Sequence, residues 1–425
     1  MKKPILAGLL IIAVFLAHSC SGRANAPTVG ADITPVATIA HVAFGQNGQD
    51  IGQAVVQAGK DRYLAAGYTD SFGVGGKDVY LVMVDSTGDC VWTKTFGSEG
   101  DDIVYAMKND GNKFILAGAT NYTDENGVYK MGKTIKNNDV NPDGTSKTAM
   151  SKGDQALLVE TDAKGNTLWY KTYGGNGNEV ANALAVTKDG YVLAGQSTSF
   201  GKNNMMYLIK TDKSGNKLWE KTYGGTEKNS CVYSIINTPD EGLMVAGYVW
   251  STVTASNDAC LIKLDAAGNV VFQRTFGGPM EEIAYSVDNV IDGGYVFAGS
   301  TNTYGMGGKD IYMVKVDSKG DCVWARTYGG TNIDVAYNII TTKEGLFLMS
   351  GYTASFGQEN FYLVKTDKMG LRPMERKYGG TNYEEARCTV EGDDGTFISV
   401  GFSNSFGPTY DFYMTATDKI GKLLW

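Results

Sequence analysis

Carboxylate side chains recur at one place in a sequence that repeats about every 50 residues. Each copy is marked by an aromatic residue followed by glycine, and an acidic or amide residue stands six positions after the aromatic one. These residues are Asp50, Asp102, Glu179, Asn229, Glu282, Asp334 and Glu384. A collar of oxygen ligands is chemistry that suits a hard cation such as Ca²⁺. The alternative is that each side chain caps backbone N–H groups of its own turn, and recurrence in almost every copy favours this structural role.

A second set of oxygen ligands lies in a polar insertion at about 121–153, in the second copy of the repeat. Asp139, Asn141 and Asp143 match the opening Asp-x-Asn-x-Asp-Gly of a calcium-binding loop. Met150 stands where that loop has its bidentate glutamate, so the match is partial. Calcium is therefore the one cofactor that the sequence suggests, and ordinary turn formation by Asp and Asn is the alternative.

Histidine is almost absent, because the chain holds only His18 and His41. This scarcity excludes most histidine-based catalysis and multi-histidine metal sites. An enzyme built on this sequence would have to use carboxylates, tyrosine or lysine. The paired acids Glu281-Glu282 and Glu384-Glu385 keep open a carbohydrate-active enzyme with two carboxylates at a channel mouth. The regularity of the repeat argues against it, because a catalytic site should break the repeat around its acids.

The elements that position these residues follow from the repeat itself. The third copy, residues 180–223, reads as four short strands joined by Asp-Gly and Asp-x-x-Gly turns. Seven such copies predict an all-β fold, a seven-bladed β-propeller of four-stranded antiparallel blades. Glycine ends the second strand of every copy, which predicts either a close approach of the neighbouring blade or a bulge. These glycines are Gly67, Gly118, Gly195, Gly247, Gly299, Gly351 and Gly401.

A large apolar residue begins each fourth strand and is expected to fill the gap between blades near the rim. The set comprises Trp92, Trp169, Trp219, Phe272, Trp324, Met374 and Trp425. The seventh copy stops at Trp425, halfway through its fourth strand, whereas residues 36–44 look like a spare fourth strand. We therefore expect the N-terminal segment to close the ring by completing the last blade. Residues 422–425 could compete for the same place.

One face of such a ring carries the long loops, and we expect any binding surface to lie there. The six carboxylates and the loop departure at Trp250 define this candidate binding face. Its residues are Asp50, Asp102, Glu179, Glu282, Asp334, Glu384 and Trp250.

The start of the chain has the pattern of an export signal. Lys2 and Lys3 precede an apolar run that is too short to span a bilayer, and Cys20 follows in a context like a lipoprotein processing site. The expected organisation is a signal peptide at 1–20, lipidated at Cys20, a linker at 21–35 and a propeller at 36–425. Cleavage after Ala26 is the alternative and would give a secreted protein.

The charge of the chain limits the class of partner. The formal net charge is −8, and no basic stripe is present, which argues against nucleic acid. Together with the expected lipid anchor, this predicts a protein of the outer membrane, on its periplasmic or outer side. The expected partner is a protein or a glycan of the cell envelope.

The repeat resembles a known class of proteins. Tyr-Gly-Gly, Asp-Gly-Tyr-Val-Leu-Ala-Gly and Lys-Thr-Asp-Lys-Ser-Gly-Asn-Lys-Leu-Trp, all within 173–219, resemble a β-propeller repeat of secreted and surface proteins in bacteria and archaea. The resemblance covers about 36–425 and implies the fold, but such propellers serve binding, adhesion and scaffold roles alike. A more distant similarity is to quinone-dehydrogenase-like propellers, among them an outer-membrane lipoprotein. The adjacent cysteines that sit beside that cofactor are missing here.

These observations lead to one expectation for function. We expect a non-enzymatic cell-envelope lipoprotein that acts as a binding or scaffold module through the long-loop face. The carbohydrate-active enzyme described above is the alternative.

Overall fold

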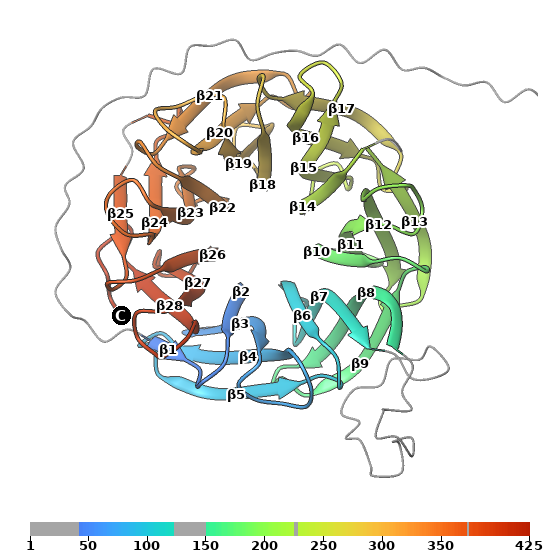
Figure 1. Ribbon diagram of the computed structural model, residues 1–425, viewed down its shortest axis with the longest axis vertical. Coiled ribbons are helices and arrows are strands. Elements are labelled where there is room, and N and C mark those ends of the chain that lie inside the picture. The colour runs from blue at the N-terminus through green and yellow to red at the C-terminus, as the bar shows by residue number, and fades with distance from the viewer. Residues whose placement is uncertain (1–41, 123–149, 225–227, 372–373) are drawn as a thin grey trace, which may run out of the picture.

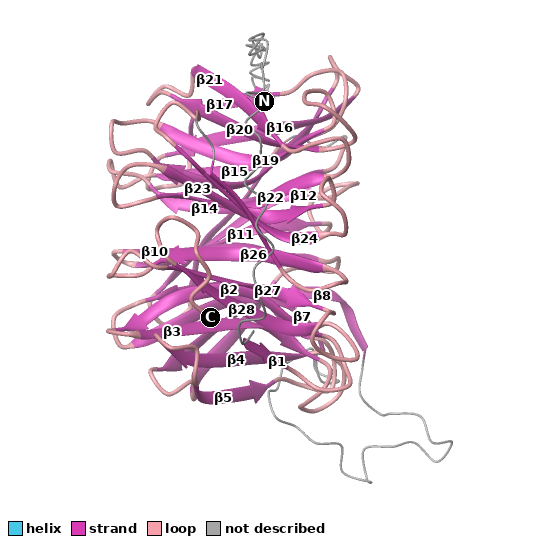
Figure 2. Cartoon of the chain, turned by 90° about the vertical axis from the view of Figure 1, so that its left-hand side faces the viewer, coloured by secondary structure: helices cyan, strands magenta, loops and turns pink. Residues whose placement is uncertain are grey.

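The chain folds into a ring of seven four-stranded sheets, which Figure 1 shows end-on and Figure 2 from the side. The computed structural model describes residues 42–122, 150–224, 228–371 and 374–425, and side chains from 153 on in the second of these segments. Each sheet is one blade, and its first strand lines the centre of the ring (Figure 1). The predicted seven-bladed propeller of antiparallel blades is thus confirmed. Within the described segments, no helix is long and apolar enough to cross a membrane.

The blades follow one another along the chain, each from its inner to its outer strand. Blades 1 to 3 comprise β2 (Asp50–Gly59), β3 (Arg62–Thr69), β4 (Asp78–Asp85), β5 (Cys90–Phe96); β6 (Asp102–Asn109), β7 (Lys113–Tyr122), β8 (Met150–Asp162), β9 (Thr167–Tyr173); and β10 (Glu179–Thr187), β11 (Gly190–Ser197), β12 (Met205–Asp212), β13 (Lys217–Tyr223). Blades 4 and 5 comprise β14 (Ser230–Asn237), β15 (Leu243–Ser251), β16 (Ser256–Leu264), β17 (Val270–Phe276); and β18 (Glu282–Asn289), β19 (Tyr295–Thr301), β20 (Asp310–Val316), β21 (Cys322–Tyr328). Blades 6 and 7 comprise β22 (Asp334–Thr341), β23 (Phe347–Thr353), β24 (Asn360–Thr366), β25 (Met374–Tyr378); and β26 (Glu384–Glu391), β27 (Phe397–Ser403), β28 (Asp411–Thr417), with β1 (Val42–Phe44) as the outer strand of blade 7.

The outer edge of blade 7 is shared by the two ends of the described chain. β1 pairs with one half of β28, from Phe412 to Met414. The other half is covered by the C-terminal residues, because Ala416 N–H donates to the Trp425 carbonyl at 2.9 Å and Leu424 N–H donates to the Ala416 carbonyl at 2.8 Å. The N-terminal strand closes the ring as predicted, and the last residues take a neighbouring place instead of competing for the same one.

The hydrophobic core lies between blades rather than within them. Seven clusters of buried side chains are present, and each joins two neighbouring blades. A blade has two apolar faces, so a sheet in the ring can bury both only by packing against both neighbours. The blades are therefore held in place by a closed series of seams.

The outer part of each seam is filled by the large apolar residue at the start of the fourth strand. At the seam between blades 3 and 4, Trp219 of blade 3 packs over Gly268 of blade 4. The contact is so close that a Cβ at Gly268 would lie 2.9 Å from the indole. The same arrangement repeats around the ring. In four seams a tyrosine ending the outer strand adds a hydrogen bond to the same turn, for example from the Tyr223 hydroxyl to the Gly268 carbonyl at 2.7 Å.

Each inner strand contains a β-bulge at the same position. In blade 6 the pairing register shifts between Ala336 and Asn338, which leaves Tyr337 without a partner residue on β23. All seven inner strands show this shift. The bulge brings backbone against the glycine of the second strand: a Cβ at Gly351 would lie 1.8 Å from the Val335 carbonyl oxygen. Of the two roles predicted for these glycines, the structure shows the bulge.

Candidate functional site at the channel mouth

The six recurring carboxylates are buried in the turns that precede the inner strands. Each is fully inaccessible to solvent. Glu179 is representative: it accepts hydrogen bonds from Gly175 N–H at 2.7 Å and from the Ser197 and Ser199 hydroxyls, both at 2.6 Å. The same kind of network surrounds Glu282 and Asp334. These carboxylates cap their own turns and attach them to the second strand, so their oxygens do not form an exposed collar.

Blade 4 departs from this pattern by one residue. Asn229, which stands at the sixth position by sequence, is exposed in the connection before β14. Ser230 takes the buried place instead, where it pairs with Val249 and its hydroxyl accepts a hydrogen bond from Met206 N–H at 3.0 Å. The connection is one residue longer in this blade, and counting from the aromatic residue therefore selects the wrong side chain.

A second layer of aspartates begins the third strands and packs against the first layer of the next blade. Asp78 is 1% exposed, and its carboxylate lies beside that of Asp102 on either side of Gly97. Burial, together with the charges of Asp102 and Asp101, raises the pKa of Asp78 to about 7. Asp310 beside Asp334 has a pKa of about 6, again mainly because of burial. Adjacent carboxylates that are buried together retain a proton on one partner.

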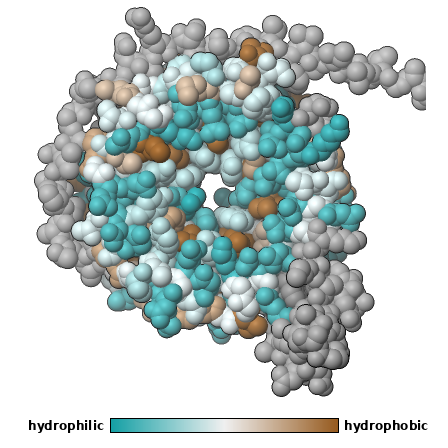
Figure 3. Space-filling view, viewed as in Figure 1, coloured by the Kyte–Doolittle hydropathy of each residue, from teal (hydrophilic) through white to brown (hydrophobic). Residues whose placement is uncertain are grey.

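The bulges present a different ring of side chains to the central channel. This bulge ring consists of Gln53, Tyr105, Asn182, Tyr233, Tyr285, Tyr337 and Arg387. All seven side chains are half-buried. Figure 3 shows that the passage at the centre of the ring is open in the space-filling view. Because a bulge leaves one residue unpaired, it can direct that side chain out of the sheet, and bulges are frequent next to functional sites.

The aromatic half of the bulge ring is continuous. The ring centroids of Tyr233 and Tyr285 are 4.9 Å apart, and those of Tyr285 and Tyr337 are 5.0 Å apart. The Arg387 guanidinium carbon lies 4.4 Å from the centroid of Tyr337, which extends the contact into blade 7. Blades 4 to 7 therefore present one connected wall of aromatic and guanidinium faces. The opposite part of the bulge ring has one tyrosine, Tyr105, between the amides Gln53 and Asn182.

Blades 6 and 7 add charge and further aromatic surface to this wall. The Arg387 Nη2 atom forms an ion pair with Glu385 Oε1 at 2.6 Å, and the Tyr383 hydroxyl donates to the other Glu385 oxygen. The Glu385 side chain is 2% exposed and that of Arg387 is 30% exposed. We call this group, with Tyr337 and Tyr352, the blade 6–7 cluster. At the position of Glu385 the other blades carry Ile, Val or Cys, so the ion pair is a departure from the repeat.

The aromatic surface continues outward from the cluster towards the loops. Tyr383 stacks on Phe402 with centroids 5.5 Å apart and packs on Tyr352 at 6.1 Å. Tyr410 meets Phe402 edge-on at 5.3 Å. Flat aromatic faces beside planar polar groups form a surface that suits rings with both apolar faces and polar edges.

The electrostatics of the cluster keep its phenols neutral. Burial, and then the nearby charge of Glu385, raises the pKa of Tyr337 and of Tyr383 above the usual range for tyrosine. Burial raises the pKa of Tyr352 to about 12. These hydroxyls can donate hydrogen bonds, but they are not activated as phenolate nucleophiles.

One further carboxylate faces the cluster from the loop between β23 and β24. Burial and the charge of Glu385 raise the pKa of Glu359. Glu359 and Glu385 therefore lie close enough for their charges to interact. The other members of the two Glu-Glu pairs have structural roles. Glu282 and Glu384 cap turns, and Glu281 forms an ion pair with Lys309 at 3.1 Å.

Trp250 lies on the long-loop side of blade 4, at the end of β15. It is half-buried, and the Lys228 ammonium lies 5.0 Å from its ring centroid. Two residues earlier on the same strand, Tyr248 packs on Tyr233 of the bulge ring at 6.1 Å. Trp250 is thus close in sequence to the aromatic wall, and no ring contact joins it to the bulge ring among the described residues.

The calcium motif and the lipidation site cannot be placed in this fold. Asp139, Asn141 and Asp143, and likewise Cys20, lie outside the described residues. Within the described segments, no group of three or more His, Cys, Asp or Glu side chains is arranged to hold a metal ion.

Sequence reasoning missed Arg387, Tyr337 and Glu359. A signal for the first two was present, because tyrosine recurs three residues after the buried carboxylate in several copies and Arg387 replaces it in the last. Strict strand alternation would assign these residues to the side of the sheet opposite to the carboxylate, and only the bulge explains why they face the channel.

Comparisons with known proteins agree with the fold and leave the activity open. No protein-family model and no curated protein matches the chain. Among solved structures, the polysaccharide lyase Uly1 aligns with a TM-score of 0.51 and 12% identity, covering 91% of this chain and 94% of its own. Sqt1 from Chaetomium thermophilum, bound to the N-terminus of ribosomal protein L10, aligns with a TM-score of 0.47 and 12% identity over 85% of this chain and 97% of its own. The periplasmic gluconolactonase PpgL of Pseudomonas aeruginosa aligns with a TM-score of 0.46 and 9% identity, over 85% and 93%. At such identities the similarity shows the propeller fold alone, and the set includes both binding proteins and enzymes.

Proposed function

We propose that this protein is a non-enzymatic binding module that holds a glycan at the mouth of its central channel, against the blade 6–7 cluster. The observation that carries the proposal is the break in the repeat at Glu385 and Arg387, beside the continuous wall of Tyr233, Tyr285 and Tyr337. In a ring of repeated units, residues shared by all blades build the scaffold, and departures from the pattern mark the place where a ligand is recognised.

The chemistry of the wall favours a sugar chain over a protein segment. Sugar rings offer C–H faces that stack on aromatic side chains and hydroxyl edges that hydrogen-bond to planar polar groups. Tyr337, Tyr352 and Tyr383 supply aromatic surface, part of which they bury against one another, and Arg387 and Glu385 supply polar groups beside it. The proposed site is half-buried and has little net charge, because the guanidinium is paired with its carboxylate.

The setting in which this binding takes place is part of the proposal. The pattern of residues 1–20 supports export and lipid attachment at Cys20, and residues 21–35 would then act as a tether. A lipid-anchored propeller with a glycan site would hold envelope polysaccharide close to the membrane surface.

Variants of the bulge ring test the proposal. With leaderless protein and a panel of envelope and plant polysaccharide fragments, calorimetry should find at least one binder. Tyr337→Leu should weaken that binder by about thirtyfold or more, because aromatic anchors at the centre of a site contribute at least about 2 kcal/mol. Asn182→Leu is the control: Asn182 belongs to the same ring, in blade 3 on the side of the channel opposite to blades 6 and 7, and this variant should bind normally. Equal losses in both variants, or no glycan binder at all, would refute the proposal.

A double variant separates the ion pair from the fold. Glu385→Gln with Arg387→Met removes both charges together and leaves no unpaired buried charge. We expect a folded protein with weaker binding.

The enzyme alternative is supported by one observation: burial, and then the charge of Glu385, raises the pKa of Glu359. A general acid with a raised pKa beside an ionised carboxylate is the arrangement that glycosidases use. Against it, Glu385 is buried and engaged by Arg387 and Tyr383. Release of new chain ends from a bound glycan, abolished by Glu359→Gln while binding persists, would establish the enzyme instead.

A further inference from the structure

The seam between blades 4 and 5 differs from all the others in its outer part. At this seam Phe272 stands where five other seams have tryptophan contributed by the preceding blade, and Phe276 stands where four have the tyrosine that bonds to the next turn. The seam is the only one of the seven in which both groups are replaced. It therefore has less side-chain volume at the rim and lacks the hydroxyl that ties the two blades together.

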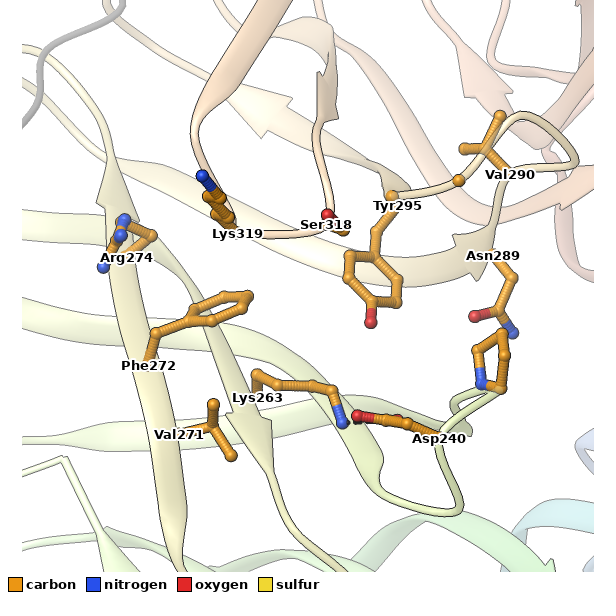
Figure 4. A pocket seen from close by; sticks show the side chains of 13 residues that line it. Asp240, Lys263, Val271, Phe272, Arg274, Asn289, Val290, Tyr295, Ser318 and Lys319 are labelled. Atoms are coloured by element: carbon orange, nitrogen blue, oxygen red, sulfur yellow. Dashed lines mark hydrogen bonds and ion pairs between the residues drawn. The ribbon is translucent and has the colours of Figure 1, made fainter.

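A cavity of about 530 Å³ occupies this seam, on the face with the short turns. Its walls come from β17, the hairpin turns of blades 4 and 5, and the turn between β20 and β21, as Figure 4 shows. Phe272, Val271, Val290 and Tyr295 make most of the surface apolar. Cavities of this size hold small organic molecules, and the position is on the side of the ring opposite to the channel-mouth loops.

The polar groups around the cavity are unevenly distributed. The Lys263 ammonium is fully engaged, because it donates to Asp240 at 2.8 Å, to Thr238 at 2.9 Å and to the Leu264 carbonyl at 3.1 Å. The equivalent pair Lys210–Asp189 in blade 3 shows that this is a structural feature of the repeat. Lys263 and Asp240 together thus add no free charge.

Two cations line the other end of the cavity. Arg274 and Lys319 are drawn on the same side of it in Figure 4, to the left of Tyr295. Arg274 forms a long ion pair with Asp321 at 3.4 Å and donates to the Gln273 carbonyl at 3.2 Å. It also stacks on Phe272, with its guanidinium carbon 5.3 Å from the ring centroid. Within the described part of the chain, the Lys319 ammonium forms no ion pair. This end of the cavity is positively charged.

Tyr295 provides a directional group near the engaged pair. Its hydroxyl points into the cavity (Figure 4), and no hydrogen bond to it is found from any described residue. In blade 3 the equivalent Tyr191 hydroxyl bonds to Asp110 and Glu160. The Tyr295 hydroxyl lies near one end of the cavity. The other end has a net positive charge, because Arg274 and Lys319 face a single carboxylate, Asp321. With the apolar walls between them, these groups suit a ligand that has an anionic head and an apolar body.

From this arrangement we propose that the seam between blades 4 and 5 is a binding site for a small organic anion with an apolar body. Its anionic group would lie between Arg274 and Lys319, and its apolar body would occupy the space left by the replacement of tryptophan with Phe272. The replacement of both rim residues by Phe272 and Phe276 creates the volume of the cavity, and the distribution of charge around it favours an anionic ligand. This site is separate from the proposed glycan site and does not depend on it.

Three probes of equal chain length test the charge requirement. Octanoate, octan-1-ol and octylammonium share one apolar body and differ in head-group charge. A ligand that binds only the folded state raises the Tm in proportion to its occupancy. We expect octanoate to raise the Tm most, octan-1-ol less and octylammonium not at all. An equal response to all three would overturn the proposal in favour of unspecific apolar binding.

Substitutions then locate the effect. Phe272→Trp introduces the residue found at five of the other six seams. It should raise the Tm of the free protein and abolish the octanoate response. Lys319→Ala should weaken octanoate binding by about tenfold, since a charge-assisted hydrogen bond is lost. Lys164→Ala is the matched control, because Lys164 occupies the same place in the exposed turn of blade 2. If Phe272→Trp raises the Tm and leaves octanoate binding intact, the cavity is only a packing gap and the proposal fails.

Discussion

The buried carboxylates and the bulge ring lie three residues apart on the same inner strands, and they differ in almost every property. The carboxylates are identical in role from blade to blade, fully buried and bonded to their own turns. The bulge ring is half-exposed and changes from glutamine to tyrosine to arginine around the channel. The difference shows how a repeat protein separates two tasks: one position keeps the blades in shape, and a neighbouring position is free to vary.

Removing a capping carboxylate should have the largest effect on stability. Glu282→Ala leaves Gly278 N–H and the Thr301 hydroxyl, which donate to Glu282 at 2.7 Å each, without an acceptor in a buried site. We expect a loss of about 3–5 kcal/mol in the free energy of unfolding. Tyr285→Leu, three residues later on the same strand, should lose about 1 kcal/mol. Urea unfolding of both variants measures the contrast, and similar losses would break the distinction between the two positions.

The carboxylate layers should also make stability depend on pH, whereas the bulge ring should not. The pKa of Asp78 is higher in the folded protein, at about 7, than its usual value of 3.8. For an acid with a raised pKa, the folded state binds more protons, so stability is full below pH 4 and falls as the pH rises towards 7. At about 1.4 kcal/mol per pKa unit, the loss is about 4 kcal/mol.

The pH effect can be checked with one substitution. Asp78→Asn keeps the shape of the side chain and cannot ionise, so its unfolding free energy should change less between pH 5 and pH 8 than that of the parent. The tyrosines of the bulge ring stay neutral in this range: burial raises the pKa of Tyr105 and of Tyr285 to about 12. An unchanged slope in Asp78→Asn would mean that other groups set the pH dependence.

Blade 4 offers the smallest and sharpest test, because its capping residue is Ser230 and carries no charge. Ser230→Ala removes the acceptor of Met206 N–H and should lower the free energy of unfolding by about 1 kcal/mol. That loss should be clearly smaller than the one from Glu282→Ala. A loss of equal size would indicate that the hydroxyl and the carboxylate contribute equally to the free energy of unfolding.

The sequence predicted the architecture well, for a physical reason. Recurring glycines, turns and apolar strands each carry a local conformational preference, and seven copies in register leave few alternatives to a closed ring. The capping role of residues such as Glu179 also followed from recurrence, as did the packing of Trp219 between blades.

The candidate sites were harder to predict because they depend on small departures whose effect is set in three dimensions. Tyr337 faces the channel only because a bulge interrupts strand alternation, and Glu359 reaches the cluster from a loop. Phe272 was visible as an exception in its column of the repeat. Whether the missing atoms leave a cavity or the neighbours close over them depends on packing, which sequence alone does not contain.

The shared outer edge of blade 7 has a mechanical consequence. β1 and the C-terminal residues cover separate halves of β28. Tension applied through the N-terminal end would therefore act first on the short ladder that joins β1 to β28. Those hydrogen bonds would break while the C-terminal half of the edge stayed paired. If the protein is tethered at its N-terminal end and pulled by a ligand bound at its channel, β1 would separate from β28 before the blades separate from one another.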